Sequence, residues 1–260
     1  MKSALLALAL IFCLALPSVA ADNRKIVIGV TPFPHKDIML IVKKLLEKEG
    51  YTLEIKEFTD YVQPNLALAG KSLDANFFQH IPYLDNMNRE KRLNLAWVAK
   101  IHIEPLCVYS KKIKRFSELQ DGDTLAIPND PTNEARALRL LETNKLISLK
   151  PGVLVTVQDI TANPKNLKIL ELEAAQLPRT LQDVSAAVIN TNFAVEAELM
   201  PSRDAIAIES KDSPYANVIA VRADTVNTPA IKALVNASHS PEVKTYIENE
   251  LLSKGIVPAF

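Results

Sequence analysis

The stretch KIVIGVTPFPHKDIMLIVKKLLEKEGYTLEIKEF, residues 25–58, decides the fold, because it contains a strand, a helix and a second strand in direct succession. Residues 25–30 are almost continuously apolar and predict a buried strand. At about 100° per residue, one face of the following helix carries Ile38, Ile41, Val42, Leu45 and Leu46. Gly50 ends this helix, and the alternating pattern of residues 52–58 predicts the second strand.

The same alternation of strands and helices continues along the rest of the chain. Helices are expected in segments such as 191–199 and 229–238. Further apolar stretches predict strands: NLAWVAKIHI (94–103), DTLAIP (123–128), LKILEL (167–172), SAAVIN (185–190), DAIAIE (204–209) and NVIAVR (217–222). Strands that alternate with helices form a mostly parallel sheet covered on both faces. At this chain length we expect two small α/β lobes rather than one large sheet.

Residues 1–21 have the pattern of a secretory signal peptide. Lys2 gives a positive start, residues 4–16 are an apolar run of 13, and PSVAA at 17–21 offers small residues for cleavage. As a helix, this run is too short to span the roughly 30 Å of a bilayer core. Cys13 follows bulky apolar residues, where a lipidation signal needs small ones. We therefore expect an exported chain without a lipid anchor.

The composition excludes several classes of protein. Removing 21 of the 260 residues leaves 239, and the chain is 48% hydrophobic, enough for one or two packed cores. Cys107 is the single cysteine after the signal, so it can form no intramolecular disulfide, and we expect it to be buried. Lys plus Arg and Asp plus Glu are both 30, which favours neither nucleic acid nor an anionic membrane surface.

The stretch AIPNDPTNEARALRLL, residues 126–141, places an arginine at the border of a helix face. Asp130 is the expected N-cap, with Pro131 at the first helical position. Arg136 and Asn133 then lie at the edge of the apolar face. Two interpretations remain open from the residues alone: a side chain that covers the edge of the core, or a guanidinium fork that binds a carboxylate or phosphate.

Polar and aromatic residues gather where the predicted strands end. These segments are TPFPH (31–35), TDYVQPN (59–65), NFFQHIPYL (76–84), PNDPTNEAR (128–136) and NTN (190–192). Ligands of α/β sheets bind at the carboxyl ends of the strands, where helices begin. Tyr61, Phe78 and Tyr83 lie in such loops, whereas the predicted core strands contain mainly Ile, Val, Leu and Ala. The loops therefore suit an apolar group and a carboxylate.

The sequence lacks the common motifs of enzymes and cofactor sites. It has no G-x-S-x-G, and with only six glycines it has no phosphate-binding loop, so we expect neither nucleophilic catalysis nor a nucleotide cofactor. The four histidines, His35, His80, His102 and His239, have no metal-binding spacing along the chain. A metal site would require them to converge in space, and the alternative is that they serve as caps, core partners and surface residues.

Several long blocks together resemble one known family. They are TPFPH, EFTDYVQPNLAL, LDANFFQHIPYL, AIPNDPTNEARAL, ELEAAQLPRTL, AAVINTNFA and SPYANVIAVR, in this order. This set is similar to the methionine-binding protein family of bacterial ABC importers, the NlpA lipoprotein family. The resemblance covers essentially the whole chain from about residue 25 onward.

The resemblance implies a two-lobed periplasmic binding protein fold of the α/β class. Each lobe would be a mixed, mostly parallel sheet flanked by helices, with the ligand cleft between the lobes. The implied organisation is a signal peptide at 1–21, a first lobe at 22–106 and 219–260, and a second lobe at 107–218.

The resemblance also implies roles for eight residues. Arg136 would grip the ligand carboxylate with help from Asn133, while Asn190 and Asn217 would hold the amino and carboxylate ends. The thioether pocket would consist of Tyr61, Phe78, His80 and Tyr83. Contacts between sulfur and aromatic edges contribute on the order of 0.3 to 1.5 kcal/mol each, which favours aromatic residues there.

The expected function is therefore a monomeric periplasmic receptor without cofactor or catalytic activity. Its ligand would be methionine, with the L form first and the D form or methionine peptides as further candidates, delivered to a membrane permease and its ATPase. The alternative among binding proteins is a zinc-type metal receptor that uses His35, His80 and His102. A hydrolase or lyase acting on amino acids is a third class, and it would need an acid–base pair in the cleft.

Overall fold

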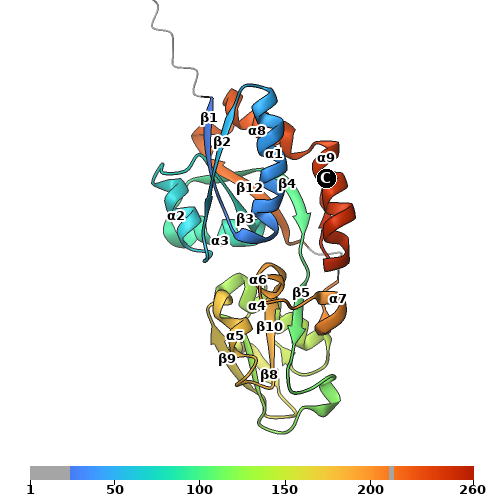
Figure 1. The fold of residues 1–260 in the computed structure, drawn as a ribbon. Helices are drawn as coiled ribbons and strands as arrows, with labels where there is room; N and C mark the ends of the chain where they lie inside the picture. Colours follow the sequence, from blue (N-terminus) through green and yellow to red (C-terminus); the bar gives the residue numbers. More distant parts are fainter. Residues whose placement is uncertain (1–23, 211–213) are drawn as a thin grey trace, which may run out of the picture.

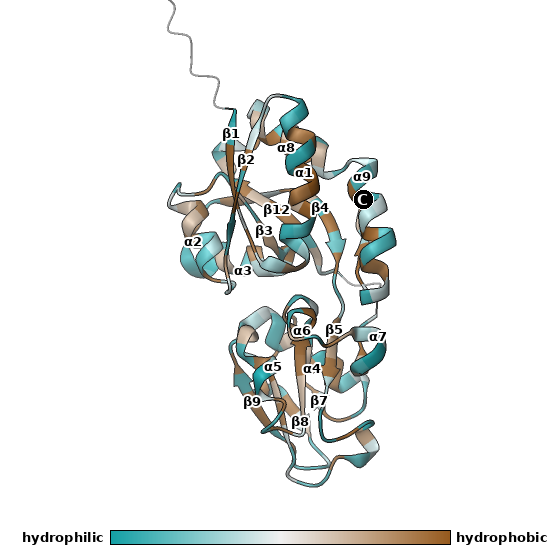
Figure 2. Cartoon of the chain, in the orientation of Figure 1, coloured by the Kyte–Doolittle hydropathy of each residue, from teal (hydrophilic) through white to brown (hydrophobic). Residues whose placement is uncertain are grey.

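The computed structural model describes residues 24–210 and 214–260, which form two lobes one above the other (Figure 1). The expected signal peptide and Cys13 lie outside these residues. Each lobe has its own sheet, and no described helix is long and apolar enough to cross a membrane. In Figure 2 the strands at the centre of each lobe are mostly hydrophobic, while the outer faces of the helices are more polar.

The first lobe is built on a six-stranded sheet of order β13-β4-β12-β3-β1-β2. Its strands are β1 (Lys25–Val30), β2 (Thr52–Glu57), β3 (Ala75–His80), β4 (Leu95–Ile103), β12 (Ala216–Arg222) and β13 (Val257–Pro258). The helices of this lobe are α1 (Asp37–Lys48), α2 (Gln63–Ala69), α3 (Ile81–Lys91), α8 (Pro229–Ser238) and α9 (Pro241–Tyr246). Strand β1 is parallel to β2 and β3, whereas β12 is antiparallel to β3 and β4.

The second lobe is built on a five-stranded sheet of order β11-β5-β10-β6-β9. Its strands are β5 (Leu106–Tyr109), β6 (Thr124–Pro128), β9 (Lys168–Leu172), β10 (Ala186–Asn190) and β11 (Ala205–Ile208). The helices are α4 (Pro131–Thr143), α5 (Leu177–Thr180), α6 (Thr191–Glu196) and α7 (Pro201–Asp204), and β7 (Ser148–Leu149) pairs with β8 (Ile160–Ala162). Strand β6 is parallel to β9 and β10, and β5 is antiparallel to β10 and β11.

Both sheets are mixed, with more antiparallel pairing than strand–helix alternation suggests. The reason is the path between the lobes. The chain leaves the first lobe through β4, enters the second through β5, and returns from β11 into β12, so these strands run against their neighbours. The predicted boundaries at 106/107 and 218/219 fall at the start of β5 and inside β12. The division of the chain into lobes by residue number stays a prediction.

The local signals of the sequence explain where several helices begin and end. Helix α1 buries Ile38, Val42 and Leu46, and it ends before Gly50, whose φ of +81° is a conformation that glycine adopts without strain. Helix α8 spans the predicted residues 229–238, whereas α6 ends at Glu196 rather than at residue 199. The next residues include Glu198, whose positive φ of 63° is incompatible with a continuing helix.

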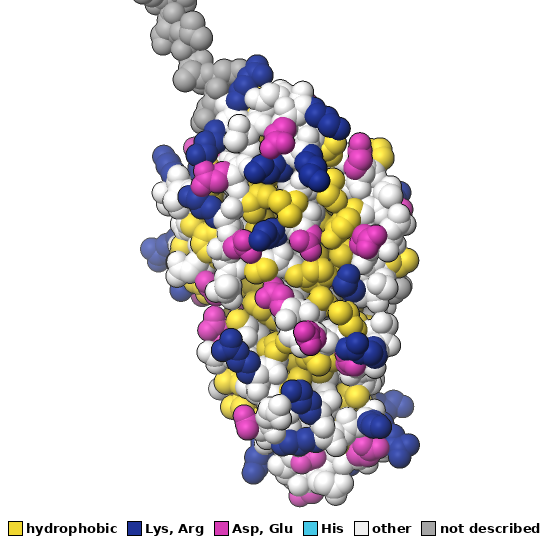
Figure 3. All heavy atoms as spheres, in the orientation of Figure 1, with side chains coloured by type: hydrophobic (Ala, Val, Ile, Leu, Met, Phe, Trp, Pro, Cys, Tyr) yellow, Lys and Arg dark blue, Asp and Glu magenta, His cyan; other side chains and the backbone are white. Residues whose placement is uncertain are grey.

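The surface shown in Figure 3 carries both signs of charge. Lys and Arg side chains alternate with Asp and Glu side chains over both lobes, and hydrophobic side chains lie between them. The expected buried thiol is present: Cys107 in β5 has no exposed surface.

Candidate functional site

A cavity lies between the two lobes, where the carboxyl ends of several strands meet helix starts. All eight residues predicted for ligand binding line it: Tyr61, Phe78, His80, Tyr83, Asn133, Arg136, Asn190 and Asn217. The other lining residues are Gln79, Glu104, Pro105, Thr191 and Asn192. The placement is thus observed, while the binding roles remain proposals.

Two helix N-caps hold predicted residues at the cavity. His80 ends β3 and caps α3, because its Nδ1 accepts a hydrogen bond of 3.1 Å from the backbone N–H of Tyr83. Asp130 caps α4 in the same way, accepting from the backbone N–H of Asn133 at 3.0 Å and from its Nδ2 at 2.9 Å. Asp130 is the cap expected from the sequence, and together with His80 it fixes the entry of both helices into the cleft.

An aromatic wall, formed by Tyr61, Phe78 and Tyr83, lines part of the cavity. The ring of Tyr61 lies 5.9 Å from Phe78, 6.0 Å from Tyr83 and 5.0 Å from Phe193, measured between centroids. The hydroxyl of Tyr83 donates to the backbone oxygen of Tyr61 at 2.9 Å. The hydroxyl of Tyr61 donates to Asn192 Oδ1 at 2.6 Å, which joins the first lobe to the second. These separations are typical of favourable aromatic pairs.

A network of amides forms the polar part of the cavity. Asn133 Oδ1 accepts from Asn190 Nδ2 at 3.0 Å and from His80 Nε2 at 3.2 Å. Because Nδ1 of His80 accepts the cap bond, its Nε2 carries the hydrogen. Burial, together with the charge of Arg136, lowers the pKa of His80 to about 3. His80 is therefore a neutral donor at neutral pH.

Two buried amide atoms at the cavity have no hydrogen-bond partner among the described residues. They are Asn190 Oδ1, an acceptor, and Asn192 Nδ2, a donor. Buried polar groups are nearly always paired, so each such atom calls for an explanation. One acceptor and one donor in the same cavity suit a ligand that carries both an ammonium and a carboxylate group.

Arg136 is engaged differently from the sequence-based expectation. Its Nε and Nη2 donate to the two carboxylate oxygens of Glu209 at 2.8 and 2.5 Å, and Nη2 also donates to the backbone oxygen of Glu104 at 2.7 Å. The ring of Tyr215 lies 4.2 Å from the guanidinium carbon. The Nε–Nη2 edge of the fork is thus occupied by the protein itself.

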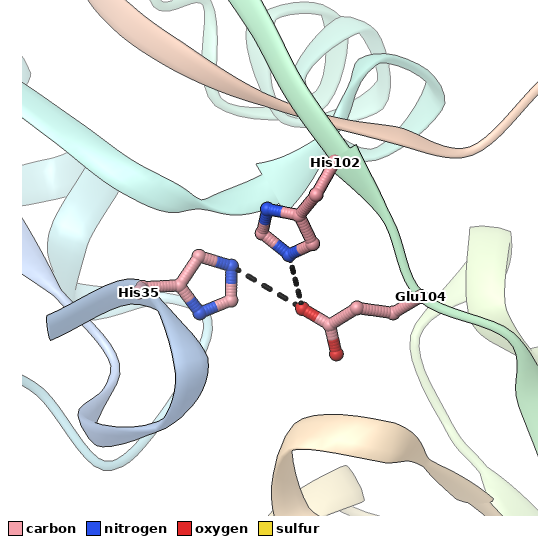
Figure 4. Close-up of side chains that lie close together, drawn as sticks. All are labelled: His35, His102 and Glu104. Carbon is pink, nitrogen blue, oxygen red and sulfur yellow. Dashed lines mark hydrogen bonds and ion pairs between the residues drawn. The ribbon is translucent and has the colours of Figure 1, made fainter. Parts of the chain in front are cut away.

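Beside the cavity, His35, His102 and Glu104 point toward one another (Figure 4). Glu104 Oε1 lies 2.7 Å from His102 Nε2 and 3.5 Å from His35 Nε2. Thr31 Oγ1 lies 2.7 Å from His35 Nδ1, and Asn217 Oδ1 lies 3.2 Å from His35 Nε2. Since Asn217 Oδ1 can only accept, Nε2 of His35 carries the hydrogen and Nδ1 accepts from the threonine.

Burial sets the charge of this trio. It lowers the pKa of His35 to about 4 and that of His102 to about 3, so both rings are neutral at neutral pH. Burial raises the pKa of the Glu104 carboxyl. The main cause of all three pKa shifts is the same: a buried group loses the water that would stabilise its charged form.

The trio is also the group of described residues whose spacing could admit a metal ion, since its three ligand atoms lie within 4.8 Å of one another. The predicted trio of His35, His80 and His102 is not formed, because His80 bonds to Asn133 and Glu104 takes its place. Hydrogen bonds within the protein already account for the imidazole Nε2 atoms of this group. The metal hypothesis therefore gains no specific support from the geometry.

Sequence reasoning missed Glu104, Asn192 and Glu209. The rule that ligands meet strand ends could have found Glu104, which directly follows the predicted strand 94–103, and Asn192, which lies in NTN after another strand. No local signal marks Glu209 as a partner of Arg136, because 73 positions separate them.

Comparisons with known proteins agree with these features. The sequence model of the family described as NlpA lipoprotein matches residues 26–260. The D-methionine-binding lipoprotein MetQ of Escherichia coli (strain K12) is 45% identical over 243 residues, which cover 90% of each chain. A nutrient binding protein from Burkholderia cenocepacia, solved bound to methionine, is 49% identical with a TM-score of 0.87, covering 90% of this chain and all of its own.

A third relative is described as an ABC transporter, periplasmic substrate-binding protein from Coxiella burnetii. It is 46% identical with a TM-score of 0.86 and covers 90% of this chain and all of its own. The names of several relatives contain the word lipoprotein, so they do not support the expectation of a chain without a lipid anchor. None of these names refers to a metal, and the metal alternative has no support from the relatives either.

Proposed function

Because this chain belongs to the NlpA lipoprotein family, we propose that it is the substrate-binding protein of an ABC importer and that its ligand is methionine. The protein would act in the periplasm and pass the ligand to a membrane permease driven by an ATPase subunit. One observation carries the proposal: a single interlobe cavity combines an aromatic wall with a buried donor and acceptor that lack partners among the described residues.

The aromatic wall suits the thioether of methionine. Tyr61, Phe78 and Tyr83 present ring edges and faces to the cavity, and sulfur contacts of this kind contribute about 0.3 to 1.5 kcal/mol each. A charged side chain would meet no counterion on this wall, whereas an unbranched thioether loses little hydration there. The wall thus favours an apolar, flexible side chain.

The polar end suits the backbone part of a free amino acid. Nη1 of Arg136 and Nδ2 of Asn192 are donors for a carboxylate, and Oδ1 of Asn190 is an acceptor for an ammonium group. Asn133 and Asn217 hold neighbouring groups in place through their bonds to Asn190 and His35. The role of Arg136 is therefore a single-nitrogen contact, with its other edge fixed by Glu209.

Residues of both lobes contact each other across the cavity, which supports binding by closure. Tyr61 bonds to Asn192 and His80 bonds to Asn133, each pair reaching from one lobe to the other. A ligand held by both lobes stabilises the closed arrangement by its differential affinity for that state. Delivery to a permease then requires that the lobes separate.

The test uses the mature protein, purified and denatured so that retained ligand is released for mass spectrometry. We expect methionine at close to one per chain. Calorimetric titration of ligand-free protein with L-methionine, D-methionine and zinc should show stoichiometric binding of methionine without turnover. Binding of zinc but of neither methionine enantiomer would overturn the proposal and favour the metal receptor.

A further inference from the structure

Glu104 is a buried carboxylate on the wall of the proposed methionine cavity. It follows β4 at the first crossing between the lobes, and only 6% of its surface is exposed. A buried carboxylate is stable in its charged form only where hydrogen bonds or a cation compensate for lost water. The identity of its partners therefore indicates what the site is built to receive.

The hydrogen-bond partners of Glu104 in the protein are neutral donors. His102 Nε2 lies 2.7 Å from Oε1, and the backbone N–H of Asn192 also donates to the carboxylate. His35 Nε2 lies 3.5 Å from Oε1, but its hydrogen is directed to Asn217. Both imidazole rings are uncharged at neutral pH, as derived above. Among the described residues, no lysine or arginine side chain forms an ion pair with Glu104.

The other charged group of the cavity wall has its own counterion. Glu209 holds Arg136 through two hydrogen bonds, and this ion pair balances the guanidinium charge. Once that pair is set aside, Glu104 is the acidic group on the described cavity wall that has no cationic partner. A ligand that brings a cation to this point would gain an ion pair with a buried carboxylate.

We propose that Glu104 is the counterion of the α-ammonium group of the ligand, and that His102 positions its carboxylate. This inference rests on the proposed function. Its consequence is a specificity rule: the receptor depends more on the free amino group of methionine than on the free carboxylate. The presence of Arg136 at the cavity would instead suggest that the carboxylate contributes more to affinity than the amino group.

The arrangement of the wall fits this assignment. The backbone oxygen of Glu104 accepts from Arg136 Nη2 at 2.7 Å, so the two residues are neighbours at the cavity. The ammonium and carboxylate groups of an α-amino acid are likewise neighbours, since one carbon carries both. Burial raises the pKa of Glu104, and an arriving ammonium group would favour its ionised form.

The competing interpretation is purely structural. Glu104 accepts from His102 of the first lobe and from the backbone of Asn192 in the second, so its carboxylate could serve only to join the lobes. In that case Glu104→Gln would weaken every ligand by the same factor. The two interpretations therefore differ in which analogue responds to the substitution.

The experiment measures calorimetric affinities of the mature protein for three probes. These are L-methionine, L-methioninol, which keeps the amine but lacks the carboxylate, and γ-(methylthio)butyric acid, which keeps the carboxylate but lacks the amine. For the wild type we expect methioninol to bind more tightly than the deamino acid. The reverse order would overturn the inference.

The substitution Glu104→Gln should weaken L-methionine and methioninol by roughly 100-fold, because it breaks a buried ion pair. Affinity for the deamino acid should stay equal or improve, since one negative charge is removed from its surroundings. Equal losses for all three probes would overturn the inference and leave a structural carboxylate. Glu248→Gln on the exposed surface is the matched control, and we expect no change.

The positioning role has its own pair of variants. His102→Gln keeps a side-chain donor toward Glu104, and we expect it to retain most of the methioninol affinity. His102→Leu removes the donor and should weaken methioninol several-fold more than the deamino acid.

If Glu104→Gln does not fold, the wild-type order of the two analogues still decides the question. A wild type that binds methionine but favours the deamino acid refutes only this inference, whereas a wild type that binds no methionine refutes the proposed function.

Discussion

At the scale of single residues, what each polar side chain at the cavity can offer to a ligand depends on which of its donors and acceptors already bond to the protein. Arg136 has five N–H donors, and the Nε–Nη2 edge binds Glu209 and the backbone of Glu104. Asn133 uses its oxygen for Asn190 and His80. A ligand therefore meets the remaining atoms, and these define the specificity.

We expect Arg136→Ala to lower both ligand affinity and stability. The variant removes the Nη1 contact proposed for the ligand carboxylate, and it leaves Glu209 without its cation. Breaking such a buried pair costs about 3 kcal/mol. Titration calorimetry and a urea melt of the same protein measure the two effects. A loss of affinity below about 10-fold would show that Arg136 is structural only.

Arg139→Ala is the control for that prediction. Arg139 lies on the same helix α4 but pairs with Glu142 in a partly exposed position, with 36% of its side chain accessible. Exposed pairs of this kind contribute roughly 0 to 1 kcal/mol. The control should change stability little and leave methionine affinity unchanged.

The buried histidines predict a loss of stability in mild acid. In the folded chain the pKa values of His35, His80 and His102 are about 4, 3 and 3, below the ordinary value of 6.5. As pH falls below 6.5, the unfolded chain binds protons that the folded chain does not, so the free energy of unfolding decreases. At pH 5 the effect is roughly 2 kcal/mol per histidine. Burial also raises the pKa values of Glu104, Glu134, Asp37 and Glu196, and these groups act in the opposite direction and offset part of the effect.

Urea melts at pH 7 and pH 5 measure this dependence. His80→Gln should flatten it, because one of the three groups no longer titrates, whereas His239→Gln on the exposed surface should not. An unfolding free energy that is equal at both pH values, or higher at pH 5, would contradict the assignment of neutral buried rings.

At the scale of the elements, the N-cap of α4 links helix stability to the ligand site. The carboxylate of Asp130 accepts from the hydroxyl of Thr132, the backbone of Asn133 and the side chain of Asn133. The first turn of α4 thus carries a residue of the cavity wall. A change at the cap should move that residue as well as fray the helix.

We expect Asp130→Ala to cost about 1 kcal/mol of stability and to weaken methionine binding several-fold. Ser240→Ala is the matched control, because Ser240 caps α9 by accepting from Val243 at 3.3 Å, far from the cavity. The control should lower stability by a similar amount without changing affinity. Equal affinities for both variants would show that the cap does not position Asn133.

At the scale of the whole molecule, closure of the lobes is visible in a few specific bonds. The hydroxyl of Tyr61 in the first lobe reaches Asn192 in the second, 131 positions away. The same tyrosine belongs to the aromatic wall. Tyr61 therefore takes part both in the contact between the lobes and in the wall of the proposed ligand site. This double role couples ligand binding to the closed position of the lobes.

We expect Tyr61→Phe to bind methionine roughly 10-fold more weakly through faster dissociation. The ring remains in the wall, but the acceptor Asn192 Oδ1 loses its donor, at a cost of about 1 to 2 kcal/mol. Stopped-flow dissociation rates measure the effect. Tyr83→Phe, which removes a bond within the first lobe, should change the rate less. Equal rates for the two variants would argue against a closing role for Tyr61.

Much of the fold and of the cavity lining follows from the sequence. The apolar stretches at 25–30 and 185–190 are strands, and Asp130 caps a helix, because these signals depend only on neighbours a few positions apart. The placement of all eight predicted residues at one cavity agrees with the rule that ligands meet strand ends, and with the family resemblance. What these residues bind stays a proposal.

The tertiary structure alone decided which atoms of those residues remain free. Glu209 occupies the fork of Arg136 across 73 positions, and His35 joins Glu104 from a different element of the first lobe. Periodicity and capping say nothing about such partners, because they report local geometry only. A side chain has a fixed number of donors and acceptors, and folding determines how many of them the protein itself consumes. The residue types were therefore set by the sequence, and the charge that the cavity offers to a ligand was set by packing.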